Sequence, residues 1–397
     1  MTTDPQAAAD SFYSSARLLL SIYYPPTTVT ITSRDPHFIS PVTKTLLRKK
    51  NKAMRKGHLD KASALSIRIR QNITAACAGQ LTQAASDIDV RTLWTSVGLI
   101  MGKNRTCGQL DVSTGINAEM LNQHYSNIST DSHYTPPILK TTCYQPLDSP
   151  TDYQVFQMLD KLKRTATGPD EIPYWFLRIA APILATPLSH LYRLSLSQSF
   201  PASQWKEAVI LPLPKVPHPN SCSEYRPISL TPIICRILER LLLRQYLHPL
   251  LLTHPFPLMP SLDDQYAYRP TGSTTAALIS LFHKISTLLE TNSHVHVITF
   301  DFSKAFDTVA HAPLINRMAS VGLPDHIFNW VSNFLTGRQH KTRFSGCLSS
   351  VASISAGVVQ GSAIGPAAFC ICVSTYRPCK PGNQSMKYAD DIYLLVP

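Results

Sequence analysis

Two adjacent aspartates, Asp390 and Asp391, interrupt the apolar stretch MKYADDIYLLV near the end of the sequence. Apolar and aromatic residues on both sides of the pair predict two short strands joined by a tight turn. A second apolar stretch, HVHVITF, predicts a strand that ends at Asp301, and the FSKAFDTV that follows predicts a turn into a helix. If the two strands are neighbours in one sheet, Asp301 and Asp390 converge.

A carboxylate at the end of a buried strand is costly to desolvate unless a cation or hydrogen-bond donors meet it. Convergent carboxylates also repel each other, and their pKa values rise. Hard divalent ions remove both conflicts, and oxygen ligands with open coordination positions suit Mg²⁺. Two such ions ~3.5–4 Å apart carry out phosphoryl transfer. Taken alone, an Asp-Asp pair is more typical of a surface turn, and DFSKAFD is also compatible with a capped helix start.

The sequence after residue 150 interleaves helical and strand-like segments without regular alternation, which indicates an α+β fold. The helical segments are 152–165, 171–198 (interrupted by Pro182 and Pro187) and 325–337. The segment 207–216 predicts a strand, and 341–357 predicts a hairpin around Ser345 and Gly346. Residues 129–151 are rich in Ser, Thr and Pro, so we expect a linker there and a domain boundary near 150.

The N-terminal extension, residues 1–150, contains a basic stretch at 41–81 that predicts one amphipathic helix, or two that meet near Gly57. The formal net charge of +12 favours a polyanionic partner, most often nucleic acid. This stretch is either a solvated helix face or a contact to a phosphate backbone, and its RKKNK cluster also fits nuclear import. The candidate nucleic-acid-binding residues are Arg48, Lys49, Lys50, Lys52, Arg55 and Lys56.

The segments FDFSKAFDTV and KYADDIYLLVP resemble motifs A and C of the reverse transcriptases of non-long-terminal-repeat (LINE-like) retrotransposons. Four more blocks occur in the family's order: TATGPDEIPYWFLR, the hairpin block with LPLPKVPHPNSCSEYRPISL, DQYAYRPTGSTTAALISL, and AGVVQGSAIGPAAF, which resembles motif B. The resemblance covers about residues 155–397. It implies the fingers and palm of a right-hand polymerase, with an antiparallel palm sheet backed by helices.

In the family, Asp301 and Asp390 would be catalytic and hold two Mg²⁺ ions, with Mn²⁺ as a possible substitute. Asp391 would be a third, more peripheral ligand or acceptor, and the backbone carbonyl of Phe302 a further ligand. The reaction implied is attack of a primer 3′-hydroxyl on a deoxynucleoside triphosphate, directed by an RNA template.

The resemblance also implies nucleotide-binding residues. Lys215 and Arg226 would fold over the triphosphate, because lysine and arginine bind phosphate oxygens well. Phe306 would exclude a ribose 2′-hydroxyl, or it is a core residue covering the sheet. Gln360 would contact the incoming nucleotide or the template, and Gly361, with Gly357, would allow close approach of a base pair or phosphate.

Other polar residues are expected to be structural. Asp307 follows Phe306 on the expected helix and would point away from Asp301. Asp170 is expected to accept hydrogen bonds in a turn and at a helix start. His311 has no partners at zinc-ligand spacing.

Three readings of the whole chain remain open at this point. It is an RNA-directed DNA polymerase, a degenerate retroelement remnant that only binds nucleic acid, or another metal-dependent phosphoryl enzyme such as a nuclease. We expect no thumb after motif C and no endonuclease domain before the polymerase, as in a truncated chain. We expect no signal peptide, no membrane partner or membrane-spanning helix, reduced cysteines, and an intracellular location in the nucleus or cytoplasm.

Overall fold

The computed structural model describes residues 3–25, 28–32, 35–36, 38–86, 115–140, 149–249, 262–269 and 272–397. The chain divides into two compact units, residues 1–20 with 114–397, and residues 21–113. This division does not coincide with the boundary expected near residue 150, because residues 5–20 of helix α1 and residues 115–140 belong to the larger unit.

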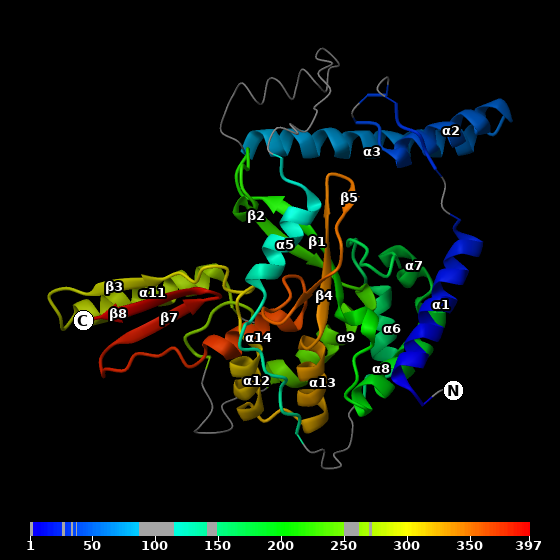
Figure 1. The fold of residues 1–397 in the computed structure, drawn as a ribbon. Helices are drawn as coiled ribbons and strands as arrows, with labels where there is room; N and C mark the ends of the chain where they lie inside the picture. Colours follow the sequence, from blue (N-terminus) through cyan, green and yellow to red (C-terminus); the bar gives the residue numbers. More distant parts are fainter. Residues whose placement is uncertain are drawn as a thin grey trace. The chain divides into compact units, whose positions relative to one another are not determined.

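The larger unit contains a mixed sheet in the strand order β2-β1-β4-β5, with β6 paired to β4 (Figure 1). Strands β1 and β2 form an antiparallel hairpin, whereas β1 and β4 run parallel. The expected hairpin at Ser345 and Gly346 is confirmed, since Phe344 pairs with Cys347 and both turn residues have positive φ. The strands are β1 (Glu207–Pro214), β2 (Tyr225–Leu230), β4 (Arg338–Phe344), β5 (Cys347–Leu348) and β6 (Ala352–Ile354).

A second, antiparallel sheet has the order β3-β8-β7, with β3 (His296–Phe300), β7 (Gln384–Tyr388) and β8 (Asp391–Val396). Helix α11 (Thr274–Leu289) lies along this sheet (Figure 1), and residues such as Leu281, Met386 and Leu395 form the core between them. The expectation that β3 is a buried strand is wrong. All five of its residues are exposed, because β3 is the edge strand of this sheet.

Helices supply most of the main core of the larger unit, which surrounds the fully buried Trp205 and Trp330. The expected interruption of the 171–198 segment falls between α7 and α8, just before Pro182, whereas Pro187 lies inside α8. The helices are α1 (Pro5–Tyr23), α5 (Ala118–Ile128), α6 (Asp152–Asp160), α7 (Tyr174–Ile179), α8 (Ala181–Ser197), α9 (Ile233–Leu242), α12 (His311–Ser320), α13 (Asp325–Leu335) and α14 (Ile364–Val373), with short turns η2 (Ser203–Lys206), η3 (Cys222–Glu224) and η4 (Leu243–Leu247).

Part of the expected linker packs against the larger unit. The backbone oxygen of Ser129 accepts hydrogen bonds from the N–H groups of Ser355 and Ala356. Further along, the Asn329 side chain donates to the backbone oxygen of Lys140 and accepts from its N–H, at 3.0 and 2.8 Å. Residues 141–148 of the expected linker lie outside the described residues.

The smaller unit contains the two expected basic helices, α2 (Pro41–Arg55) and α3 (Leu59–Ser86), which pack against each other. Ser40 caps α2, and Gly57 adopts φ = 71° between the two helices, a conformation that glycine takes easily. Of the six candidate cations, Lys50 is half-buried and the others are exposed. Among the described residues, no helix is long and apolar enough to cross a membrane.

Candidate active site

Asp301 and Asp391 lie opposite each other at one end of the β3-β8-β7 sheet. Strands β3 and β8 are antiparallel neighbours in which Phe300 pairs with Ile392, so the next position of each chain brings the two aspartates together. The pKa of Asp391 is raised, first by burial and then by the charges of Asp390 and Asp301. The expected convergence of the Asp301 strand with the Asp390 hairpin is therefore confirmed.

Asp390 occupies a two-residue turn between β7 and β8. Tyr388 pairs with Asp391, so Ala389 and Asp390 form the turn, and Ala389 adopts φ = 57°. Positive φ is uncommon for alanine, and such strained residues often occur at functional sites. Asp301 and Asp391 are exposed and Asp390 is half-buried.

Within the described residues, no group of three or more His, Cys, Asp or Glu side chains is arranged to hold a metal ion. The three aspartates therefore share one end of the sheet without forming a closed ligand cluster. Their donor atoms are nevertheless all carboxylate oxygens, and the repulsion that raises the pKa of Asp391 is the kind that a hard divalent cation relieves. The donor set fits such a cation.

The segment after Asp301 is a series of turns, and the helix expected there is wrong. Residues 303–307 form turns in which Lys304 adopts φ = 53°, and α12 begins only at His311. The N–H groups of Asp307 and Thr308 both donate to the backbone oxygen of Lys304. A left-handed lysine cannot continue an α-helix, so the chain changes direction here.

The turn at 303–307 contacts a second segment, residues 356–361, which we name the glycine segment. The N–H of Val358 donates to the backbone oxygen of Phe306, and the N–H of Gly357 donates to that of Val309, at 2.7 and 2.8 Å. The buried His311 donates from Nε2 to the backbone oxygen of Gly357, and burial lowers the pKa of its imidazole. Through these contacts the Asp301 segment and the glycine segment hold each other in place.

Gly357 and Gly361 in this segment have positive φ, and backbone atoms of other segments lie where a side chain would be. Gly357 adopts φ = 88°, and a Cβ there would lie 2.8 Å from the backbone oxygen of Asp307. Gly361 adopts φ = 120°, and a Cβ there would lie 2.5 Å from the backbone oxygen of Ser229. At both positions protein backbone therefore occupies the space that a side chain would need.

Phe306 packs between two aromatic rings and stays half-buried. Its ring stacks on Phe369 at a centroid distance of 4.7 Å and meets Tyr268 edge-on at 6.2 Å. Tyr268 is close enough to Asp390 that this charge helps to raise the pKa of its hydroxyl, after burial. Phe306 is therefore part of the core and also near the aspartate turn, so both readings of this residue remain compatible with its position.

The two expected phosphate-binding cations lie on the β1–β2 hairpin. Arg226 pairs with Leu213 and is exposed, and Lys215 follows β1 and donates from Nζ to the backbone oxygen of Ser223 at 2.8 Å. Lys215 and Lys304 both act to lower the pKa of Asp307, although burial raises it overall. The charge of Lys215 is therefore felt at the Asp301 segment.

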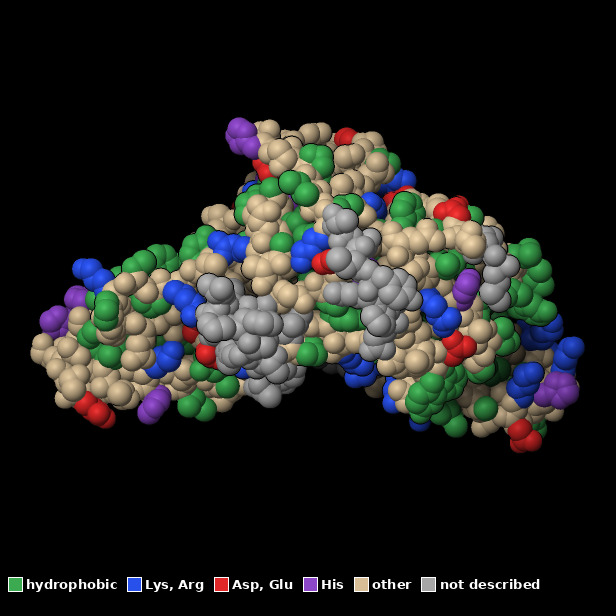
Figure 2. Space-filling model, turned by 90° about the horizontal axis from the view of Figure 1, so that it is seen from below, with side chains coloured by type: hydrophobic (Ala, Val, Ile, Leu, Met, Phe, Trp, Pro, Cys, Tyr) green, Lys and Arg blue, Asp and Glu red, His purple; other side chains and the backbone are tan. Residues whose placement is uncertain are grey.

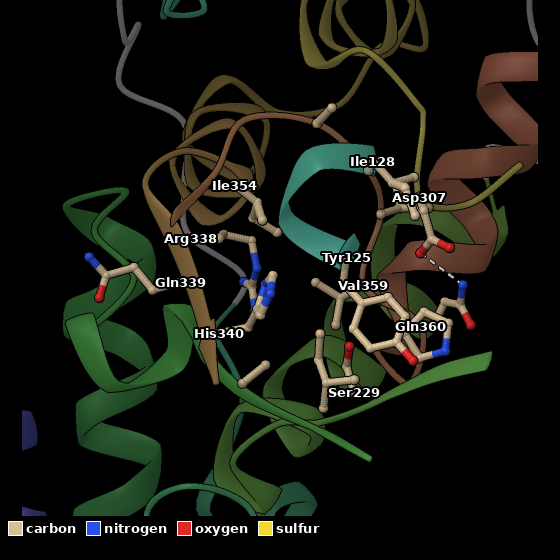
Figure 3. Close-up of a pocket in the computed structure, with 16 residues that line it drawn as sticks. Tyr125, Ile128, Ser229, Asp307, Arg338, Gln339, His340, Ile354, Val359 and Gln360 are labelled. Carbon is tan, nitrogen blue, oxygen red and sulfur yellow. Dashed lines mark hydrogen bonds between the residues drawn. The ribbon is translucent and has the colours of Figure 1, made fainter. Parts of the chain in front are cut away.

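A small cavity of about 40 Å³ lies beside the glycine segment (Figure 3). Asp307 and Gln360 line one side of it, and Arg338 and His340 of β4 line another. A nucleotide needs a site of roughly 300 Å³ or more, whereas this space holds a few water molecules. We conclude that the cavity belongs to the packing of the fold and is not the substrate site.

Comparison with known proteins finds a family-model match over a little under half of the chain. Residues 213–397 match the family model described as reverse transcriptase (RNA-dependent DNA polymerase). This segment includes Asp301, Asp390 and Asp391, the β1–β2 hairpin turn and the glycine segment. Residues 213–397 are thus similar to a reverse transcriptase domain.

Proteins similar to this chain include RNA-directed DNA polymerases of mobile elements. The RNA-directed DNA polymerase from mobile element jockey of Drosophila funebris is 29% identical over 264 residues, which is 63% of this chain and 28% of the relative. The probable RNA-directed DNA polymerase from transposon X-element of Drosophila melanogaster is 30% identical over 175 residues, or 44% of this chain and 18% of the relative. The chain thus spans less than a third of the length of these relatives.

Among solved structures, a telomerase from Candida albicans in complex with a fragment of telomeric RNA matches 53% of this chain and 42% of its own, with 13% identity and a TM-score of 0.35. A likeness at this level carries no conclusion about this chain.

The structure adds a residue to the reverse transcriptase domain that the sequence did not single out. Glu239 of α9 is fully buried and accepts hydrogen bonds from the hydroxyl of Ser362 and from the N–H groups of Ala363 and Ile364, at the start of α14. A carboxylate at a helix N-terminus is stabilised by the unpaired N–H groups and the helix dipole. The sequence signal that could have identified Glu239 is an acidic residue on the apolar face of α9, between Cys235 and Leu242.

Proposed function

We propose that this chain catalyses RNA-directed DNA synthesis, transferring a deoxynucleotide to a primer 3′-hydroxyl with release of pyrophosphate. The observation that carries the proposal is the register of β3 and β8, which brings Asp301 opposite Asp391 and beside the Asp390 turn in a reverse transcriptase domain. The partners would be an RNA template, a DNA primer and deoxynucleoside triphosphates.

In this proposal Asp301, Asp390 and Asp391 are the catalytic carboxylates and would hold two Mg²⁺ ions or, as a substitute, Mn²⁺. The backbone carbonyl of Phe302 would be a further ligand. When bound, the ions would lower the pKa of the primer hydroxyl and neutralise the leaving pyrophosphate. The protein's own contribution is to fix the positions of the carboxylates, which the β3–β8 pairing and the two-residue turn support.

We assign nucleotide binding to residues of the β1–β2 hairpin, of the turn after Asp301 and of the glycine segment. Lys215 and Arg226 on the β1–β2 hairpin would bind the triphosphate, since both are exposed cations. Phe306 would line the sugar site, and Gln360 and Gly361 would contact the nucleotide or template. The hydrogen bond from the backbone N–H of Ser229 to the oxygen of Gln360 links the hairpin to the glycine segment, which supports a shared role.

We further propose that residues 151–397 supply the fingers and palm, with the β1–β2 hairpin in the fingers and the β3-β8-β7 sheet in the palm. Residues 1–150 would be an N-terminal extension whose α2 cations bind the RNA backbone. The exposed positions of Arg48, Lys49, Lys52, Arg55 and Lys56 support this role, with Lys50 half-buried beside them. Elsewhere, on the face drawn in Figure 2, basic side chains are dispersed and do not form a single patch.

Primer extension on an RNA template tests the proposal. The purified chain is expected to extend an annealed DNA primer only with Mg²⁺ or Mn²⁺ present, and Asp301→Asn should reduce the rate by about 10³-fold or more, because Asn removes a charged ligand. Asp160→Asn, an exposed acid on α6, is the matched control and should keep the wild-type rate. Absence of metal-dependent extension together with tight, salt-sensitive RNA binding would favour the binding-only remnant instead.

A further inference from the structure

A short segment of chain adds to the edge of the β3-β8-β7 sheet beside the aspartate turn. We name residues 264–267 the strap. The N–H of Lys387 donates to the backbone oxygen of Asp264 at 2.6 Å, and the N–H of Tyr266 donates to the backbone oxygen of Lys387 at 2.9 Å. Gln265 and Lys387 form a parallel bridge, so the strap runs alongside β7 toward the turn.

The side chain of Gln265 holds both backbone polar groups of Ala389. Its Oε1 accepts from the N–H of Ala389 at 2.9 Å, and its Nε2 donates to the backbone oxygen of Ala389 at 3.3 Å. Oε1 also accepts from the N–H of Ala267, which fixes the amide against its own strap. Gln265 is fully buried, so water does not compete for these bonds.

The Gln265 side chain binds Ala389, which is the strained residue of the turn between β7 and β8. Ala389 has φ = 57°, and a non-glycine residue keeps such a conformation only when its surroundings impose it. A carboxamide has both a donor and an acceptor and can therefore bind both groups of one residue, which an apolar side chain cannot do. Asp390 and Asp391 come directly after Ala389, so a change in the Ala389 dihedral angles would redirect both carboxylates.

A separate polar cluster anchors the strap at its other end. The buried Lys387 forms an ion pair with Asp264 at 3.1 Å, and the hydroxyl of Ser385 donates to the same carboxylate at 2.6 Å. Ser385 lies four residues before Ala389, and its hydroxyl contact is to the strap. It therefore offers a control that perturbs the strap without touching the Gln265 amide.

We propose that Gln265 is a positioning residue of the polymerase site, which sets the direction of Asp390 and Asp391 by clamping the Ala389 peptide groups. The proposal rests on the proposed function, because the carboxylates it positions are those assigned to metal binding. It assigns a role to a residue that would not touch the substrate or the metal ions itself.

Activity measurements on the full chain test the positioning role. Gln265→Met keeps the length of the side chain and removes both hydrogen bonds to Ala389, together with the one from the N–H of Ala267. It is expected to lower kcat by about 10²-fold, with little change in the KM for the nucleotide, because misplaced catalytic groups reduce the rate of the chemical step. The Mg²⁺ concentration for half-maximal rate should rise about 10-fold, as for other groups that orient metal ligands. Ser385→Ala should leave both quantities near wild type.

Hydrogen exchange of the Ala389 amide separates this inference from the polymerase assignment. Gln265→Met should speed exchange at Ala389 by about 10-fold or more relative to Ser385→Ala, whether or not the chain extends a primer. An inactive wild type with this exchange difference would overturn the polymerase function and leave the clamp standing. Unchanged exchange at Ala389, or wild-type kcat and Mg²⁺ dependence in a folded Gln265→Met variant of an active enzyme, would overturn the inference.

Discussion

Gln360 donates a hydrogen bond from its side-chain Nε2 to the carboxylate of Asp307, with 2.8 Å between Nε2 and Oδ1 (Figure 3). The backbone oxygen of Gln360 accepts from Ser229 at the same time. One residue thus connects the turn after Asp301 with the β1–β2 hairpin. Asp307 was expected to be structural on a helix; it lies in a turn, where its carboxylate accepts this bond from Gln360.

Removing the Asp307 carboxylate should release the Gln360 side chain. Asp307→Ala is expected to raise the KM for the deoxynucleotide about 10-fold, which corresponds to the loss of one charge-assisted hydrogen bond of about 1.4 kcal/mol. Asp307→Asn keeps an oxygen acceptor and should have a smaller effect. Steady-state primer extension measures both values, and equal KM values for Asp307→Ala and wild type would show that this contact does not position Gln360 for the nucleotide.

The pKa of Asp391 reports on the convergence of the three aspartates. Burial raises it first, and the charges of Asp390 and Asp301 raise it further, so Asp301→Asn should lower the pKa of Asp391 without restoring its ordinary value. Asp301→Asn should also increase stability at neutral pH, because the raised pKa means that ionised Asp391 destabilises the folded state. Titration of the carboxyl carbons by NMR checks the shift, with Asp160→Asn as control. A pKa of Asp391 that does not respond would place Asp301 too far away to share a site.

The sequence predicted the parts of the site that depend on strand pairing. The apolar residues on either side of Asp390 and Asp391 predict a hairpin, and the structure contains it as β7 and β8. The sequence left the pairing of the Asp301 strand with this hairpin as a condition, and the structure meets it by pairing β3 with β8. Several residues together specify each strand, so the prediction that a strand exists still holds when its ends are misplaced by one or two residues.

The predictions that the structure corrects depend on the conformation or the surroundings of individual residues. The left-handed conformation of Lys304, which replaces the expected helix by turns, has no signature in a lysine. The apolar sequence of β3 indicated burial, yet an edge position leaves Phe300 about half exposed (47%). The glycines at 357 and 361 were correctly seen to permit close approach, but only the fold shows that the backbone of Asp307 and Ser229 approaches them.

The buried carboxylate of Glu239 should contribute substantially to stability. Glu239→Gln leaves a neutral carbonyl oxygen for the three donors at the start of α14 and removes the negative charge that these donors and the helix dipole stabilise, so we expect the free energy of unfolding to fall by about 1–3 kcal/mol. Glu290→Gln, an exposed residue just after α11, is the matched control and should change stability by less than about 0.5 kcal/mol. Urea unfolding measures both differences. A Glu239→Gln variant as stable as the control would mean that the start of α14 does not depend on this charge.

Asp170 should make the stability of the larger unit pH-dependent. It was expected to accept hydrogen bonds in a turn and at a helix start; the start of α7 has no side-chain cap, and the Asp170 side chain is buried. Burial raises its pKa to about 6, and this outweighs the opposing charges of Arg17 and Arg236.

A carboxyl whose pKa is higher in the folded state destabilises the fold where it is ionised, so stability should decrease as the pH rises from about 4 to 6 and then level off. The decrease attributable to Asp170 is about 3 kcal/mol at most. Asp170→Asn should therefore be more stable than wild type at pH 7, and the difference should shrink toward zero at pH 4. Urea unfolding at both pH values, with Asp160→Asn as control, measures the effect. If Asp170→Asn were less stable than wild type by the same amount at pH 4 and pH 7, the hydrogen bonds of the Asp170 side chain would matter to stability and its raised pKa would not.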